Sequence, residues 1–129
     1  MAKKMDELTG KEISLLGYGC MRFPTYETGE TDARGRKIKA IDMEKSKALI
    51  EYAYANGITH YDTAWNYHNG KSAEAIGSLL KGYPRESFTL CNKMPGWLIT
   101  GPEKAKELFE TQLQQCGVEY FDYYLCHAI

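Results

Sequence analysis

Short apolar runs recur along the chain and predict buried β-strands. Four such runs cover residues 17–23, 58–62, 88–93 and 121–126. The last three follow one another at intervals of roughly thirty residues, the length of a strand–helix–strand unit with a right-handed crossover. Such units build a parallel sheet that is covered by helices. The pattern therefore predicts an α/β fold with about four parallel strands.

Three segments between these strands carry apolar side chains at three- and four-residue steps and predict helices. They cover residues 44–56, 72–81 and 102–116. In the first segment, the repeating positions are Ala48, Leu49, Tyr52 and Ala55. Ser72 is expected to cap the second helix, because a serine hydroxyl can accept a hydrogen bond from a first-turn amide.

Two stretches lie outside this strand–helix repeat. Residues 12–16 predict one strand of a small hairpin at the base of the fold. Residues 24–40 contain two glycines and little that is apolar, so they predict a long exposed loop. Loops of this length inside compact domains are often functional.

Composition narrows the class of protein. The 129 residues fit a single domain, and 43% hydrophobic and 26% charged residues are ordinary for a globular protein. The net charge of −1 indicates neither a nucleic-acid partner nor a membrane-attracting surface. The sequence shows no signal peptide and no apolar run of about 18 residues, so we expect a cytoplasmic protein that does not enter the membrane.

The four cysteines lie too far apart in the sequence for a zinc knuckle or a thioredoxin motif. We expect them to be buried free thiols in a reducing compartment. They are Cys20, Cys91, Cys116 and Cys126. His60, His68 and His127 do not have a recognised metal-site spacing either, so we predict no metal.

Three predicted strands each carry an ionisable residue near the C-terminal end. These residues are Asp62, Lys93 and His127, and Tyr67 lies in the loop that follows Asp62. In parallel β/α folds, active sites form at the C-terminal ends of the strands. We therefore expect the four side chains to gather around one mouth.

Together the four residues suit the protonation of an oxygen on which negative charge develops. Asp62 can hold Lys93 as an ammonium, and an ammonium beside a phenol makes that phenol a better proton donor near neutral pH. His127 could then orient the oxygen of the substrate. This chemistry is what the reduction of a carbonyl group by hydride requires. Each residue alone also has a purely structural explanation, so the interpretation depends on the set.

The sequence resembles the aldo-keto reductases over residues 8–129. The resemblance lies in Asp62-Thr63-Ala64-x-x-Tyr67, in Lys93, in Tyr-Tyr-Leu-Cys-His127, and in the opening segment from Leu16 to Arg22. It implies a partial (β/α)8 TIM barrel, with residues 1–129 as one domain that forms the N-terminal half. It also implies an NADPH-dependent oxidoreductase that reduces aldehydes or ketones, as small-molecule substrates, to alcohols.

The resemblance also assigns roles to individual residues. By likeness to the family, Asp62, Tyr67, Lys93 and His127 form the catalytic tetrad, with Tyr67 as proton donor. Gly19, Met21 and Asp62 are expected to contact the cofactor. The loops after the strands add three residues that are expected to line a substrate pocket, namely Trp65, His68 and Trp97.

The sequence also departs from the family pattern. His68-Asn69-Gly70-Lys71-Ser72-Ala73-Glu74 resembles a branch found in anaerobic microbes, some members of which carry a C-terminal iron–sulfur domain. The sequence ends after the fourth predicted strand, so we expect a truncated barrel with two open edges.

Open edges lead us to expect self-association or a complementary barrel half as partner. We expect the chain alone to bind NADPH weakly and to reduce carbonyls slowly or not at all. The alternative function is a non-catalytic half-barrel that serves as an assembly or scaffold module. A metal-dependent hydrolase barrel is disfavoured, because no His-x-His follows the first strand.

Overall fold

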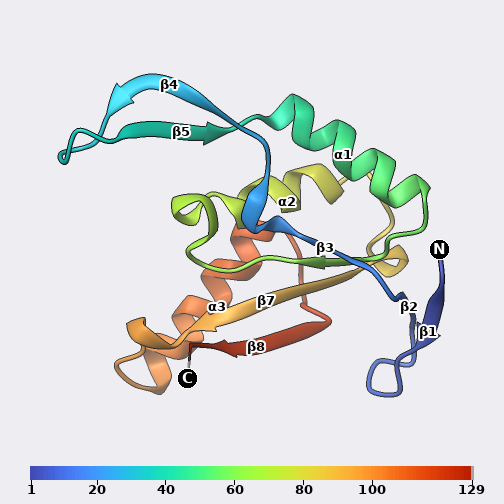
Figure 1. The fold of residues 1–129 in the computed structure, drawn as a ribbon. Coiled ribbons are helices and arrows are strands. Elements are labelled where there is room, and N and C mark those ends of the chain that lie inside the picture. Colours follow the sequence, from blue (N-terminus) through green and yellow to red (C-terminus); the bar gives the residue numbers. More distant parts are fainter. Residues whose placement is uncertain (129) are drawn as a thin grey trace.

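A four-stranded parallel sheet forms the centre of the protein in the computed structural model, which describes residues 1–128 (Figure 1). Its strands lie in the order β3 (Gly17–Gly19), β6 (His60–Asp62), β7 (Thr89–Pro95) and β8 (Tyr123–His127). The helices are α1 (Met43–Ala55), α2 (Ser72–Leu80) and α3 (Pro102–Cys116). This arrangement confirms the predicted α/β class and the first half of a β/α barrel.

The three helices pack on one face of the sheet and form the core with it (Figure 1). Tyr61 and Leu90 project from neighbouring strands into this core and are fully buried. Helices α2 and α3 are in tight contact at Gly77, where a Cβ atom would lie 2.3 Å from the carbonyl oxygen of Cys116. Only glycine therefore lets α2 and α3 pack this closely.

The buried face of α1 differs from the predicted one. The side chains that face the core belong to Ser46, Ile50 and Ala53, whereas Leu49 is 45% exposed and Tyr52 is 72% exposed. The apolar repeat through Leu49 and Tyr52 was the stronger pattern, but it lies on the outer side. Helix α1 carries apolar residues on two sides, so periodicity alone could not identify the face that meets the sheet.

Ser72 does not cap α2, which corrects a second prediction. Lys71 occupies the N-cap position. Ser72 is the first residue of the helix, and it has no exposed surface. The Ser72 hydroxyl donates to the carbonyl of Cys20 at 3.0 Å and lies 2.9 Å from the Thr63 hydroxyl. The hydroxyl therefore connects α2 to the ends of β3 and β6 instead of to its own first turn.

Residues 24–40 do not form the predicted loop. They contain most of an antiparallel hairpin of β4 (Thr25–Thr31) and β5 (Lys37–Ile41) that projects away from the sheet (Figure 1). Asp32 organises its turn, because the carboxylate accepts from the amides of Arg34 and Arg36, both at 2.9 Å. Every residue of β4 is exposed, so the strand has no apolar face by which its sequence could reveal it.

A second hairpin lies at the other end of the sheet, at the N-terminal ends of its strands. It confirms the prediction of a hairpin strand in residues 12–16, although the strand ends at Ser14. It pairs β1 (Lys3–Met5) with β2 (Glu12–Ser14). The hydroxyl of Tyr123 donates to Asp6 at 2.6 Å, and Lys11 pairs with Asp122 at 2.7 Å. These contacts fasten the hairpin beneath the sheet.

Short 3-10 helices link several of these elements. They are η1 (Cys20–Arg22), η2 (Tyr67–Gly70), η3 (Arg85–Ser87) and η4 (Gly96–Leu98). Among residues 1–128, no helix combines the length and the hydropathy needed to cross a membrane.

The four cysteines are free thiols, and three of them are buried as predicted. Cys126 is the exception, since it is exposed. It lies on β8, which borders the sheet, and its side chain lies outside the core formed by the three helices.

Candidate active site

The four predicted catalytic residues lie at the same end of the sheet. Asp62 and His127 are the last residues of β6 and β8, and Tyr67 begins η2 in the loop after β6. Lys93 is two residues short of the end of β7, which runs on to Pro95 instead of ending at Lys93 as predicted. Because β6 ends opposite Cys91, Lys93 still lies beyond the end of its neighbouring strand.

An ion pair between Lys93 and Asp62 lies at the centre of this end of the sheet. The Lys93 Nζ atom is 2.7 Å from Oδ1 and 2.8 Å from Oδ2 of Asp62, and 2.7 Å from the carbonyl oxygen of Thr63. The lysine side chain is only 12% exposed. These three close acceptors fix the position of the ammonium group.

The aromatic side chains of Tyr67 and His127 complete the group. Lys93 Nζ lies 4.9 Å from the centre of the Tyr67 ring, within range of a cation–π interaction. The rings of Tyr67 and His127 meet edge to face with centres 6.2 Å apart, and the Trp97 ring lies 5.3 Å from that of His127. The four side chains therefore lie together at one mouth, as the sequence predicted.

His127 carries an unpaired polar atom. Its Nδ1 is buried and has no hydrogen-bond partner within the described residues 1–128. Buried polar atoms are nearly always paired, and Ser46 Oγ and Arg85 Nε are two further orphans in the described part of the chain, so the orphan alone does not mark a site.

Besides Asp62, the residues expected to contact the cofactor lie at and just after the end of β3, the strand that pairs with β6. Gly19 ends β3 and is the register partner of Asp62 in the sheet. A Cβ atom at Gly19 would meet nothing within 4 Å, so protein packing does not explain the glycine and a ligand would have room there. Met21 follows in η1 and is 51% exposed. Their contacts with a cofactor remain predictions.

The residues expected to line the substrate pocket lie in different surroundings. Trp97 is half exposed beside His127, and Trp65 is partly buried in the loop between Asp62 and Tyr67. His68 is turned toward η1, where its Nε2 accepts a hydrogen bond of 3.0 Å from the amide of Phe23. Burial lowers the pKa of His68, which favours the neutral ring that can accept this bond. The pocket role of all three remains a prediction.

His60 lies deeper on the side of the sheet that carries Asp62. Its Nδ1 is 2.8 Å from the hydroxyl of Thr89, and its ring meets that of Tyr123 edge to face. Burial lowers the pKa of His60, although the carboxylates of Asp62 and Asp122 act in the opposite direction. In the described part of the chain, no three His, Cys, Asp or Glu side chains are grouped as metal ligands.

Sequence reasoning missed a buried polar group behind Lys93. Gln112 of α3 is fully buried, and its Nε2 donates to the carbonyl oxygen of Lys93 at 2.8 Å. The available signal was its place in the helix, because Gln112 falls between Leu108 and Cys116 at four-residue steps on the buried face. A polar residue in such a stripe requires a buried partner.

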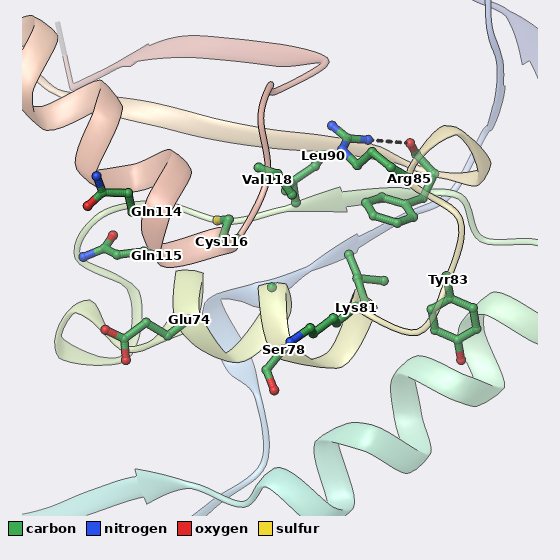
Figure 2. A pocket seen from close by; sticks show the side chains of 14 residues that line it. Glu74, Ser78, Lys81, Tyr83, Arg85, Leu90, Gln114, Gln115, Cys116 and Val118 are labelled. Carbon is green, nitrogen blue, oxygen red and sulfur yellow. Dashed lines mark hydrogen bonds between the residues drawn. The ribbon is translucent and has the colours of Figure 1, made fainter.

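A groove of about 450 Å³ lies apart from this mouth, between α2, the last turn of α3 and the start of β7 (Figure 2). Figure 2 shows Arg85 at its margin, where Nη1 donates to the carbonyl oxygen of Phe88 at 3.0 Å. Glu74, Lys81 and glutamines of α3 also line the groove. None of the four candidate catalytic residues does, so the groove is not part of the mouth.

The sequence matches known proteins over nearly its whole length. The profile of the aldo/keto reductase family matches residues 15–129. A probable aldo-keto reductase of Glycine max is 34% identical over 128 residues, which cover 93% of this chain and 34% of the relative. The methylglyoxal reductase YeaE of Escherichia coli (strain K12) is 33% identical, with 98% of this chain and 40% of the relative covered. The chain thus spans well under half the length of these relatives.

Solved structures agree on the fold. The thermostable aldo-keto reductase Tm1743, crystallised with the inhibitor epalrestat, superposes with a TM-score of 0.74 at 30% identity, over 98% of this chain and 43% of that one. An aldo-keto reductase of Klebsiella pneumoniae, crystallised with NADPH, gives a TM-score of 0.73 at 24% identity, over 98% and 40%. At that lower identity the second likeness concerns the fold alone.

Proposed function

The chain belongs to the aldo-keto reductase family, and on this premise we propose that Asp62, Tyr67, Lys93 and His127 form the proton-donating site of a carbonyl reductase. The reaction is the NADPH-dependent reduction of an aldehyde or ketone to an alcohol. The observation that supports it most is the placement of the Lys93 ammonium, bound to both carboxylate oxygens of Asp62 and 4.9 Å from the centre of the Tyr67 ring.

Each side chain has a distinct task in this proposal. Tyr67 donates its phenolic proton to the carbonyl oxygen of the substrate, on which negative charge develops. The ammonium of Lys93 stabilises the phenolate that remains, and Asp62 holds that ammonium in place. His127, between Tyr67 and Trp97, hydrogen-bonds the same oxygen and orients it. Trp97 covers one side of the mouth.

NADPH would supply the hydride that reaches the carbonyl carbon. Gly19, Met21 and Asp62 are the residues we propose to hold it, because Gly19 pairs with Asp62 in the sheet and has open space beside it, and Met21 follows two residues later with an exposed side chain. The aldo-keto reductase of Klebsiella pneumoniae is crystallised with NADPH, which supports a nicotinamide cofactor for the family.

We further propose that the outer edges of the sheet are covered during function, by a second copy of the chain or by a complementary half of a barrel. Each of the bordering strands, β3 and β8, pairs on one side only within residues 1–128. Leu125 on β8 is 49% exposed, and Leu15 and Leu16 before β3 are 66% and 55% exposed. Unpaired edges with exposed apolar side chains favour association. When only this chain is present, a second copy is the available cover, so light scattering at tens of micromolar should give a mass above that of one chain.

We propose that the protein is cytoplasmic. All four cysteines are free thiols, as is usual in a reducing compartment.

The proposed reaction is tested by following NADPH absorbance with methylglyoxal as the probe aldehyde. We expect slow turnover whose specific rate rises with protein concentration, because covered edges complete the mouth. Replacing Tyr67→Phe should lower the rate by roughly a hundredfold or more, the usual contribution of a positioned general acid. Tyr52→Phe is the matched control, since Tyr52 is 72% exposed on α1.

Equal rates for Tyr67→Phe and the unaltered chain would contradict the proton-donor role. If NADPH fluorescence shows no saturable change at any protein concentration, the non-catalytic scaffold becomes the better interpretation.

A further inference from the structure

The backbone of Lys93 lies where the sheet loses a strand. Strand β6 ends at Asp62, opposite Cys91, whereas β7 continues to Pro95. The odd-numbered residues of β7 direct their backbone amides and carbonyls toward β6. The Thr89 amide donates to the Thr59 carbonyl at 2.7 Å, and the Cys91 carbonyl accepts from the Thr63 amide at 3.0 Å. Lys93 is the next residue in this series. Its amide and carbonyl therefore point to the position beside β7 where β6 would pair if it continued past Asp62.

Two side-chain amides occupy the place of the missing strand. The Lys93 amide donates to Oδ1 of Asn92 at 2.8 Å, and the Lys93 carbonyl accepts from Nε2 of Gln112 at 2.8 Å. The same Nε2 donates to Oδ1 of Asn92 at 3.0 Å. Asn92 and Gln112 have no exposed surface, so water does not compete for these bonds.

Gln112 is itself held in one orientation. The hydroxyl of Tyr124 donates to its Oε1. The Lys93 carbonyl can only accept a hydrogen bond, so the end of the Gln112 amide that faces it is the nitrogen. Burial raises the pKa of Tyr124 to about 12, so the hydroxyl keeps its proton and remains a donor. Asn92 is held as well, because its Nδ2 donates to the sulfur of Cys116 at 3.9 Å.

We propose that Gln112 is a positioning residue for Lys93. It holds the lysine backbone extended, two residues past Cys91, so that the side chain on the other face of the strand reaches Asp62 and Tyr67. An apolar residue of similar size could fill the space but could not donate to the Lys93 carbonyl. The inference rests on the proposed role of Lys93 in the active site.

The test measures the reactivity of Lys93 without using enzyme activity, so failure of the proposed reaction would not decide it. The chain is acetylated with N-hydroxysuccinimidyl acetate, and mass spectrometry gives the rate at Lys93 relative to Lys106, whose side chain is 76% exposed. In the unaltered chain Lys93 should be among the slowest lysines, because its ammonium is bound by three acceptors.

Gln112→Met should raise the ratio of the two rates by about fivefold or more, as the ammonium becomes free of Asp62 for part of the time. Two controls separate positioning from general loosening. Gln114→Met changes an exposed glutamine of the same helix, and Ile50→Val weakens the core at α1. Neither should change the ratio. An unchanged ratio in folded Gln112→Met, or an equal rise in Ile50→Val, would overturn the inference.

A measurement on the unaltered chain tests the hydrogen bonds on which the inference rests, even if Gln112→Met does not fold. The side-chain amide protons of Gln112 should exchange with solvent at least about tenfold more slowly than those of Gln114, because they are buried in hydrogen bonds. Exchange of the two amides at equal rates would show that Gln112 does not hold Lys93.

Discussion

Replacing Asp122→Asn should destabilise the protein more than any change at its surface. The Asp122 side chain is 2% exposed, and its carboxylate accepts from Lys11 Nζ at 2.7 Å, Arg85 Nη2 at 2.7 Å and the Leu90 amide at 2.9 Å. It therefore connects the N-terminal hairpin and η3 to the start of β7. Burial acts to raise the pKa of Asp122, but the bonds from Lys11, Leu90 and Arg85 outweigh it and lower that pKa below its usual value.

Asparagine keeps the shape of the side chain and one acceptor but removes the charge. Each hydrogen bond to a charged partner contributes roughly 1.5–3 kcal/mol. Lys11 and Arg85 donate to different oxygens of Asp122, so in asparagine one of the two bonds is weakened and the other is lost, because the amide nitrogen cannot accept. The side chains of Lys11 and Arg85 are 29% and 21% exposed, so both cations can turn toward water and recover part of the lost hydrogen-bond free energy. We therefore expect a loss of about 2–3 kcal/mol in the free energy of unfolding.

Urea denaturation followed by circular dichroism measures this loss, which corresponds to a midpoint shift of about 1–2 M for an ordinary dependence on urea. The matched control is Asp32→Asn in the turn of the β4–β5 hairpin, where the partner Arg36 is 71% exposed and the cost should stay below about 1 kcal/mol.

The dependence on pH gives a second check. A carboxyl whose pKa is lowered by folding stabilises the protein fully above its unfolded value, near 3.9, and this contribution is lost as the pH falls through the folded value. The difference between the unaltered chain and Asp122→Asn should therefore shrink below about pH 4. A loss under about 0.5 kcal/mol at pH 7 would refute the reasoning, as would a difference that does not shrink in acid.

Two further predictions test the packing. Gly77→Ala should lower the free energy of unfolding, measured by urea denaturation, by about 2 kcal/mol or more, because its Cβ would lie 2.3 Å from the carbonyl oxygen of Cys116. The control is Gly82→Ala, where a Cβ meets nothing within 4 Å. Equal losses in the two variants would argue against the close contact of α2 and α3. Ellman's reagent should modify one thiol quickly, that of exposed Cys126, because burial raises the pKa of Cys91 and of Cys116 to about 12. Rapid modification of two or more thiols in the folded chain would contradict the burial of the other three cysteines.

The sequence predicted the parallel sheet and the convergence of the site because both follow from local rules. Alternating strands and helices permit few topologies, and the C-terminal ends of parallel strands meet at one edge. Asp62, Lys93 and His127 could thus be brought together without knowledge of any side-chain contact. The exact end of β7 could not be predicted, because it depends on pairing with β8 beyond the point where β6 has ended.

The features that were mispredicted depend on contacts between distant parts of the chain. Ser72 has the sequence signature of a cap, yet its hydroxyl meets Cys20, which is 52 positions away. The β4–β5 hairpin is held by the Asp32 turn and has little buried surface, so the apolar pattern did not reveal it. The role of Gln112 could not be predicted from α3 alone, because its partner, the Lys93 carbonyl, lies on β7.

The meeting of four side chains from distant parts of the chain is the central claim, and NMR nuclear Overhauser measurements test it most directly. In the folded chain we expect cross-peaks between the ε-methylene of Lys93 and the ring of Tyr67, and between the rings of Tyr67 and His127. The Lys93 methylene should also be shifted upfield by the Tyr67 ring, and this shift should vanish in Tyr67→Leu. A folded chain without these cross-peaks, in which Lys93 resembles the exposed lysines, would contradict the account.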